Sequence, residues 1–419
     1  MRPVAVQHTR PVWAEVSSAA LCANYRRLCA AAGPDVDVLA VVKANAYGHG
    51  AAECAPVLAR AGARWFGVTA AEEGVTVRAA LRAAGVKDAA RILIMCGVWQ
   101  HEAAFCFDHA LTPVVWEPYQ LALLEQEAMH RHWPHGVFAV HVEIDTGMAR
   151  QGVAPGAALA ALLSALRASP HLRLEALLTH FASAEVVDDP QNREQQQRFE
   201  VAVEQTHAAG FRPDLLHAGN TSGVDSAATA AWLPGLQASL GSTSGSAPQL
   251  MTRAGLALYG YTLPLHGFPE RGAAEPASHL PGMEPALVWK TRIVSLRTLA
   301  RGETVGYNAT YVAARPMRVA LLPVGYADGF RRALSSTNAV EGSTVLIHGR
   351  RAPIVGRVSM DLSVVDVSAV PEAAVGDAVT LLGRDGALSI SAAEHARLAG
   401  TNVYEILCGI SDRVPRLIV

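Results

Sequence analysis

Val38-Leu-Ala-Val-Val-Lys-Ala-Asn-Ala-Tyr-Gly-His-Gly50 is the stretch of sequence that decides the fold. Its first five residues are apolar, as in a parallel strand that is covered on both faces. The run ends abruptly at Lys43, and Asn45 and two glycines then supply the residues of a turn before residues 51–61, which are predicted to form a helix. A lysine at the carboxyl end of a buried strand stands where α/β barrels carry their catalytic residues.

The usual interpretation of a lone lysine is a solvated surface side chain. Here the sharp junction with the apolar run, and Tyr47 with two glycines just after it, favour a site for a phosphate-bearing ligand. An amine in a pocket of low dielectric loses its proton more readily and can form a Schiff base with an aldehyde.

Strand-like and helix-like segments alternate through the first part of the chain. Expected helices begin after most of the strands, which are predicted at 12–16, 38–42, 65–68, 91–95, 112–116, 137–144, 174–179, 215–216 and 255–259. Roughly eight such units close an α/β fold of the TIM type, a (β/α)8 barrel. A doubly wound open sheet is the alternative, but no GxGxxG fingerprint follows an early strand.

Two irregular stretches interrupt this pattern. Residues 236–249 are rich in Gly and Ser and are predicted to form an exposed loop, and residues 263–285 carry the domain boundary. The sequence therefore predicts a barrel over residues 1–270 and a mostly β domain, a sandwich or small barrel, over 283–419. Its expected strands are 286–296, 317–323, 343–348, 354–358, 362–367 and 378–382, with one clear helix at 392–399.

Composition excludes several classes of function. The 419 residues carry a net charge of −2 and no basic block, which argues against a nucleic-acid surface. No apolar run is long enough to span a bilayer, and residues 1–15 have no apolar core of a secretory signal, so we expect no membrane association. The six cysteines form no CxxC pair, which indicates reduced thiols in a cytoplasmic protein without a metal site.

Polar residues follow the expected strands at several places. They are Lys43, the loop Asp145-Thr-Gly-Met-Ala-Arg150, His180, the segment His217-Ala-Gly-Asn-Thr-Ser222, and Arg253 just before the last expected strand. A single histidine after an apolar run is usually a satisfied core residue. Five such positions on one rim of a barrel make a binding site the better interpretation.

These motifs closely resemble those of the alanine racemases, enzymes of fold type III that use pyridoxal phosphate, and the resemblance covers essentially the whole chain. It implies that Lys43 in AVVKANAYGHG carries the cofactor. The residues that it implies for the phosphate are Tyr47, Thr221, Ser222, the backbone N–H groups of Gly255 and Leu256, and Tyr404. Hydroxyls and amides around a glycine-containing turn suit an anion.

The same resemblance gives roles to two arginines. Arg253 would donate to the pyridine nitrogen and, because it stays charged, keep that nitrogen unprotonated. Arg150 would lie near the substrate carboxylate. Many members carry a carbamylated lysine that orients this arginine, whereas this chain has Glu143. We expect the permanent carboxylate of Glu143 to do the same; an ordinary solvent-facing glutamate is the alternative.

Three residues of the second domain match family positions. Tyr307 in GETVGYNATY would be the second base, because racemisation needs a proton removed from one face of Cα and delivered to the other. By the resemblance it comes from the partner subunit of a homodimer and contacts His180, while Lys43 serves the opposite, D face. The Met360 backbone N–H would bind the substrate carboxylate, and Tyr326 would line the entry channel.

The expected activity is interconversion of L- and D-alanine for peptidoglycan synthesis. A racemase of broader specificity, acting on serine or other small amino acids, stays open because the sequence does not give the pocket size. A decarboxylase relative is disfavoured by Arg253, and a D-serine dehydratase by the lack of paired His/Cys spacing near the C-terminus. A cofactor-binding protein without enzymatic activity would lack the second domain.

Overall fold

The computed structural model describes residues 9–86, 90–244, 247–267 and 277–419, which divide into two compact units. The barrel unit comprises Ala19–Ala46 and Cys54–Glu284. The β unit comprises the described residues up to Ser18, together with Tyr47–Glu53 and Pro285–Val419. Among the described residues, no helix is long and apolar enough to cross a membrane.

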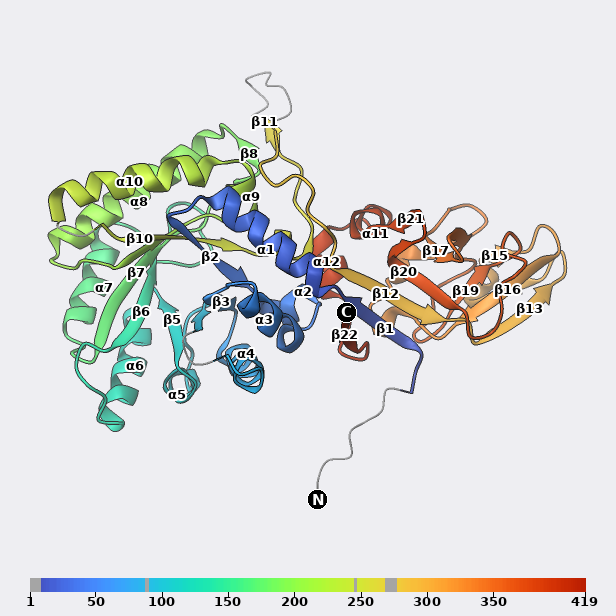
Figure 1. The fold of residues 1–419 in the computed structure, drawn as a ribbon, viewed down its shortest axis with the longest axis horizontal. Coiled ribbons are helices and arrows are strands. Elements are labelled where there is room, and N and C mark those ends of the chain that lie inside the picture. The colour runs from blue at the N-terminus through green and yellow to red at the C-terminus, as the bar shows by residue number, and fades with distance from the viewer. Residues whose placement is uncertain (1–8, 87–89, 245–246, 268–276) are drawn as a thin grey trace. The chain divides into compact units, whose positions relative to one another are not determined.

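Eight parallel strands close the barrel of the first unit, as the sequence predicts (Figure 1). In barrel order they are β10 (Gln249–Ala254), β2 (Val36–Val41), β3 (Trp65–Val68), β4 (Arg91–Ile94), β5 (Leu111–Val115), β6 (Phe138–Glu143), β7 (Leu172–Leu178) and β9 (Leu215–His217). Every residue of β3 and β5 is buried, because the barrel interior covers one face of each strand and helices cover the other.

Helices alternate with these strands and lie around the barrel (Figure 1). They are α1 (Ser18–Ala32), α2 (Lys43–Tyr47), α3 (Ala51–Arg60), α4 (Ala71–Ala83), α5 (Glu102–Asp108), α6 (Pro118–His130), α7 (Ala157–Arg167), α8 (Pro190–Ala208), α9 (Thr221–Asp225) and α10 (Ala228–Ser244). Two short strands outside the barrel, β8 (Val186–Val187) and β11 (His266–Gly267), pair with each other.

Three expectations for the barrel are wrong. Residues 255–259 are not the last strand: Leu256–Tyr259 is a 3-10 turn, and β10 precedes it, so that Arg253 lies within a strand. Residues 236–244 are not a loop but the end of α10, although 245–246 lie outside the described residues. The predicted strand Val12–Val16 exists as β1 but pairs with strands of the β unit. Part of the irregular stretch 263–285 also lies outside the described residues.

The β unit contains one large sheet and smaller ones. The large sheet has the order β18 (Arg350–Pro353), β17 (Thr344–Ile347), β20 (Ala378–Asp385), β12 (Leu287–Arg292), β1 and β22 (Arg416–Ile418), with β21 (Leu388–Ile390) on β20. A second sheet joins β13 (Ser295–Leu299), β16 (Met317–Leu322) and β19 (Ser363–Asp366), and a hairpin joins β14 (Thr304–Val305) to β15 (Tyr311–Val312).

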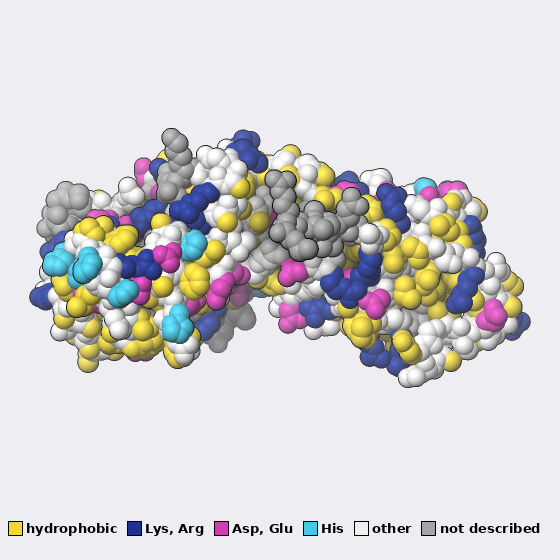
Figure 2. Space-filling model, turned by 90° about the horizontal axis from the view of Figure 1, so that it is seen from below, with side chains coloured by type: hydrophobic (Ala, Val, Ile, Leu, Met, Phe, Trp, Pro, Cys, Tyr) yellow, Lys and Arg dark blue, Asp and Glu magenta, His cyan; other side chains and the backbone are white. Residues whose placement is uncertain are grey.

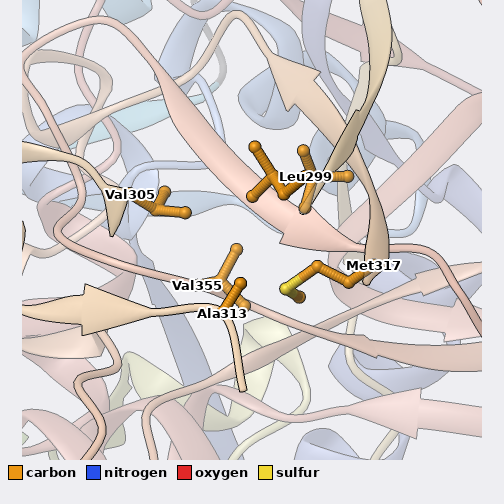
Figure 3. Packing of buried hydrophobic residues seen from close by; sticks show 6 residues of the cluster. Leu299, Val305, Ala313, Met317 and Val355 are labelled. Atoms are coloured by element: carbon orange, nitrogen blue, oxygen red, sulfur yellow. The ribbon is translucent and has the colours of Figure 1, made fainter. Parts of the chain in front are cut away.

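Two helices complete this unit, α11 (Ala392–Ala399) and α12 (Val403–Cys408). The predicted helix 392–399 is confirmed, whereas α12 was not expected. The predicted strand 286–296 is two strands, β12 and β13, and 354–358 follows β18 instead of forming a strand. A small hydrophobic cluster, Leu299, Val305, Ala313, Met317 and Val355, packs beside the three-stranded sheet (Figure 3).

Candidate active site

Lys43 directly follows β2 and begins a turn of unusual handedness. Ala44, Asn45, Ala46 and Tyr47 all have φ between 50° and 55°, the left-handed region that residues with a side chain rarely occupy. The Ala46 N–H donates to the Val42 carbonyl at 2.8 Å, and the Ala44 N–H donates to the Glu73 carboxylate at 2.7 Å. These contacts fix the start of the turn, and with it the backbone of Lys43, at the carboxyl end of the barrel strands.

Arg150 lies in an ordered loop that leaves β6. The Asp145 carboxylate accepts from the N–H groups of Gly147 and Ala149 at 2.9 and 3.1 Å, which folds the loop back on itself. The Arg150 side chain is exposed. Besides burial and Arg253, the charge of Arg150 contributes to the lowered pKa of His180 and opposes the raised pKa of Glu143.

Glu143 ends β6 with only 5% of its surface exposed, which makes the solvent-facing alternative wrong. Burial raises its pKa, and the nearby Arg253 guanidinium is the largest opposing influence. Gln151 donates to the Glu143 carboxylate at 2.5 Å and to the Met95 carbonyl at 2.9 Å. The Glu143 carboxylate thus accepts a hydrogen bond from Gln151, a residue that the sequence did not single out, and orientation of Arg150 stays a prediction.

Arg253 is buried in β10 and held on several sides. One terminal nitrogen donates to the Thr179 carbonyl at 2.6 Å and lies 3.3 Å from Nδ1 of His180. The other lies 3.2 Å from the His217 carbonyl and 3.3 Å from Nδ1 of His217. Burial lowers the pKa of Arg253 to about 10, which still leaves the guanidinium charged at neutral pH.

His180 follows β7 and stays neutral. Burial and the positive charges of Arg253, Arg150 and Lys43 lower its pKa to about 3. Three cationic side chains at the mouth of the barrel thus act electrostatically on one imidazole, and one of them, Arg253, lies 3.3 Å from it. Buried Glu143 is one carboxylate among them, so the mouth of the barrel suits an anionic ligand.

A turn at the start of α9 approaches the turn after β10. The Thr221 hydroxyl accepts from the N–H groups of Gly255 and Ala257 at 3.2 and 3.3 Å, and the Asn220 side chain caps the helix through the Gly223 N–H at 3.0 Å. Thr221, Ser222 and Leu256 are all buried. The structure thus brings together the hydroxyl and amide groups that the sequence assigned to phosphate binding in this unit.

The remaining predicted residues lie in the β unit. Tyr47 and Tyr404 face each other with ring centroids 5.9 Å apart, and burial raises the pKa of Tyr47. The Tyr326 N–H donates to the Ser359 carbonyl at 3.0 Å, and the Ala327 N–H donates to the Met360 carbonyl at 3.0 Å. Tyr326 and Met360 therefore lie on adjoining loops.

Tyr307 is on a short 3-10 turn, Tyr307–Ala309, with 69% of its surface exposed. Two residues earlier, Val305 is anchored in the hydrophobic cluster of Figure 3. A Cβ added to Gly356 would lie 2.8 Å from the Val305 carbonyl, so the loop 356–361 passes close to the base of the tyrosine turn. The structure thus groups Tyr307, Tyr326 and Met360 within one unit.

Sequence reasoning missed a set of buried polar residues in the barrel. His141 lies within β6 and Glu175 within β7, each with apolar residues on both sides in the chain, and both are buried. His217 was noted at a strand end but given no role. A charged or imidazole side chain inside a strand covered on both faces is the signal that could have identified them.

A parallel barrel with a lysine, two arginines and a histidine at its mouth, joined to a β unit with an exposed tyrosine, defines a class of two-domain α/β-barrel enzymes. Comparison with protein families narrows the class. Residues 16–263 match the N-terminal domain of alanine racemase and residues 286–418 match its C-terminal domain. The chain belongs to the alanine racemase family.

Individual relatives agree over nearly their full lengths. The chain is 39% identical to the alanine racemase of Symbiobacterium thermophilum over 412 residues, 97% of each chain, and 36% identical to that of Halothermothrix orenii over 409 residues, 97% of each. Among solved structures, alanine racemase from Streptomyces coelicolor A3(2) has a TM-score of 0.82 at 29% identity, covering 98% of this chain and 99% of that one. The enzyme from Bacillus anthracis with bound L-Ala-P has a TM-score of 0.80 at 29% identity, covering 98% and 95%.

Proposed function

We propose that this chain interconverts L- and D-alanine with pyridoxal phosphate and two opposed bases. The observation that carries the proposal is the placement of Lys43 at the mouth of a barrel that also presents a buried, charged Arg253 and a turn lined with hydroxyl and amide groups. The D-alanine product would serve peptidoglycan synthesis.

The residues present fit the cofactor. An anionic phosphate suits the buried Thr221 and Ser222 hydroxyls and the amides of the Gly255–Leu256 turn, together with Tyr47 and Tyr404. When bound, pyridoxal phosphate withdraws electrons from the substrate Cα and so acidifies the proton there. Arg253 would donate an N–H to the ring nitrogen. With a pKa of about 10 it donates a hydrogen bond but keeps its proton.

Racemisation requires one group on each face of the substrate Cα. The Lys43 amine would remove or return the proton on the D side, and the Tyr307 hydroxyl would do so on the L side. Arg150 and the Met360 N–H would hold the substrate carboxylate, so that the Cα proton points at one base or the other.

We also propose that the enzyme is a homodimer in which Tyr307 serves the partner's site. Tyr307, Tyr326 and Met360 are exposed to 69%, 43% and 54% within the single chain, and Leu362 adjoins them through the hydrogen bond from the Ser359 N–H to the Leu362 carbonyl. Exposed apolar side chains gathered in this way are typical of a protein–protein interface.

The test is α-proton exchange in D₂O, followed by NMR, with each alanine enantiomer added separately to wild type and to Tyr307→Phe. We expect wild type to exchange the proton of both enantiomers, and the variant to lose mainly exchange from L-alanine, because only the L-side base is removed. Equal exchange by the variant and wild type would place the second base elsewhere. Val312→Ala, at another exposed residue of the β unit, is a control for general effects of substitution.

A further inference from the structure

A continuous series of polar side chains crosses the interior of the barrel. His217 Nδ1 lies 3.3 Å from the Arg253 guanidinium, and its Nε2 lies 3.2 Å from Nδ1 of His141. His141 Nε2 in turn lies 2.9 Å from the Glu175 carboxylate. Arg253, His217, His141 and Glu175 come from four different strands, β10, β9, β6 and β7, and all are buried.

The far end of the series is anchored by two arginines. Arg91 donates to both oxygens of Glu175 at 2.7 and 2.6 Å, and Arg173 donates to one of them at 3.0 Å. The hydrogen bonds from His141 and Arg91 hold the pKa of Glu175 far below its usual range, so the carboxylate is ionised. Arg91 also lies 4.3 Å from the centre of the Trp65 ring, which packs beside His141.

The two ends fix the direction of every hydrogen bond between them. A guanidinium only donates and an ionised carboxylate only accepts. His217 Nδ1 must therefore accept from Arg253, which places its proton on Nε2 facing His141 Nδ1. His141 then has its proton on Nε2, where it donates to Glu175. Any other neutral tautomer leaves two donors or two acceptors facing each other inside the barrel.

At neutral pH, neither imidazole binds a second proton that would change this order of donors and acceptors. Burial lowers the pKa of both His141 and His217, so each imidazole carries a single proton at neutral pH. The positive charge of Arg253 lowers the pKa of His217 further.

We propose that Glu175 is a positioning residue: through His141 it sets the tautomer of His217 and thereby keeps a lone pair directed at Arg253. Arg253 then has an acceptor for one terminal nitrogen, which holds the guanidinium in one orientation. The order of donors rests on the geometry of these side chains alone. The effect of this orientation on the hydrogen bond from Arg253 to a pyridine nitrogen of the cofactor rests on the proposed function.

Glu175→Gln tests the order of donors with little change in shape. The glutamine side chain has both a donor and an acceptor, so it can pair with either tautomer of His141 and no longer imposes a direction. Arg91 and Arg173 keep partial access to water, with 36% and 40% of their side chains exposed, so the loss of the carboxylate leaves charges that can be solvated.

The measurement is ¹⁵N NMR of the histidine-labelled, full-length protein as purified with its cofactor, with signals assigned through single His→Asn variants. We expect wild-type His217 to be unprotonated at Nδ1, and Glu175→Gln to show both tautomers. Glu194→Gln makes the same chemical change at an exposed i,i+4 pair with Arg198 and should leave His217 as in wild type. Arg91→Gln weakens the anchor but keeps the carboxylate, so it should keep one tautomer.

The catalytic consequence has its own measurement. We expect Glu175→Gln to lower kcat/KM for alanine by up to about tenfold, the low end of the effect typical for direct partners of a functional group, because Glu175 is three hydrogen bonds from Arg253. Glu175→Asp, which keeps the acceptor, should restore a single tautomer and most of the activity.

Either part of the proposal can fail separately. A wild-type His217 protonated at Nδ1, or a single tautomer retained in Glu175→Gln, would overturn the order of donors, whether or not the protein racemises alanine. Two tautomers with unchanged kcat/KM would overturn the link to Arg253. Absence of racemase activity in wild type would contradict the proposed function and leave the result on tautomers standing.

Discussion

At the scale of single residues, Glu143 is a buried carboxylate at the end of β6. Its carboxylate is buried beside Gln151 and close to Arg253 and Arg150. We expect Glu143→Gln to lower kcat/KM for alanine by about tenfold, since a hydrogen bond to a charged group contributes roughly 1.5–3 kcal/mol. Steady-state kinetics with Glu194→Gln as the matched control would measure this, and unchanged kinetics would assign Glu143 a purely structural role.

The Glu143 carboxylate should also make kcat/KM depend on pH. Burial raises the pKa of Glu143 above its ordinary value of 4.5, so the charged form, which we propose orients Arg150, should be lost as pH falls through this raised pKa. We expect wild-type kcat/KM to decline on the acid side with a midpoint above 4.5. In Glu143→Gln this particular decline should disappear from the pH profile, because the amide does not titrate.

The placement of Lys43 and His180 after strands was predictable from the sequence, since an apolar run stops at each; Arg253 was expected before a strand but lies within β10. Gln151, His141 and Glu175 were not singled out, because their roles depend on which strands become neighbours in a closed barrel. Side chains on β6 and β7 meet only when the two strands pair, and which residues then face each other depends on their register.

At the scale of elements, helix α12 packs closely against Gly48. This glycine lies 359 residues before Leu407, the helix residue that it approaches. Gly48 has φ of 79°, and a Cβ there would lie 2.0 Å from the Leu407 carbonyl oxygen. We expect Gly48→Ala to destabilise the protein by several kcal/mol, because backbone must move and Tyr404 lies on the same helix. Gly400→Ala is the control: its φ of 66° carries the same strain of about 1 kcal/mol, but nothing lies within 4 Å of the added Cβ. Equal melting temperatures for the two variants would contradict the steric argument.

Helix α11 carries a buried histidine that makes stability depend on pH. Burial lowers the pKa of His395 to about 4, so the unfolded chain, with an ordinary value near 6.5, binds the proton more readily. The free energy of unfolding should fall as pH drops below 6.5, and this residue contributes on the order of 3 kcal/mol to that loss by pH 4. His395→Phe should flatten the dependence in urea titrations at several pH values, and an equal slope in both proteins would exclude His395 as its source.

Elements were predictable where periodicity and length were clear, and the errors have physical causes. Gly255–Tyr259 is apolar enough for a strand, but its glycine begins a tight turn and the true strand, β10, contains the polar Thr252 and Arg253. Helix α10 continues through Gly and Ser residues that are typical of loops. Helix α12 has only six residues, too few for a helical period to show.

At the scale of the whole molecule, the proposed sharing of sites between subunits can be measured by mixing inactive variants. Lys43→Ala lacks the lysine and Tyr307→Phe lacks the tyrosine, so each homodimer should be impaired at both sites. In an equal mixture that has exchanged subunits, half of the dimers are mixed and each has one intact site, so about a quarter of wild-type activity should return. No recovery, despite mixed dimers seen by native mass spectrometry, would mean that both bases come from one chain.

The order of the two units along the chain was predictable, because a long alternating region gives way to short β-rich segments. That β1 belongs to the sheet of the β unit was not predictable. Val12–Val16 precedes the barrel in sequence, yet it pairs with β12, nearly three hundred residues later, and such a pairing leaves no mark on the local sequence. Acidic and basic side chains are interspersed over the face shown in Figure 2, in line with the small net charge.

The turn that follows Lys43 has a consequence for chirality. Four successive residues, three of them with side chains no larger than that of asparagine, trace the mirror image of an ordinary helical turn, at a cost of about 1–2 kcal/mol each for L-amino acids. The D-enantiomer of each residue would adopt this backbone without strain. A semisynthetic protein with D-alanine at position 44 should therefore resist heat better than the natural one. The loop beside Lys43 contains L-alanine, but its backbone conformation suits the D-enantiomer, which the enzyme is proposed to make.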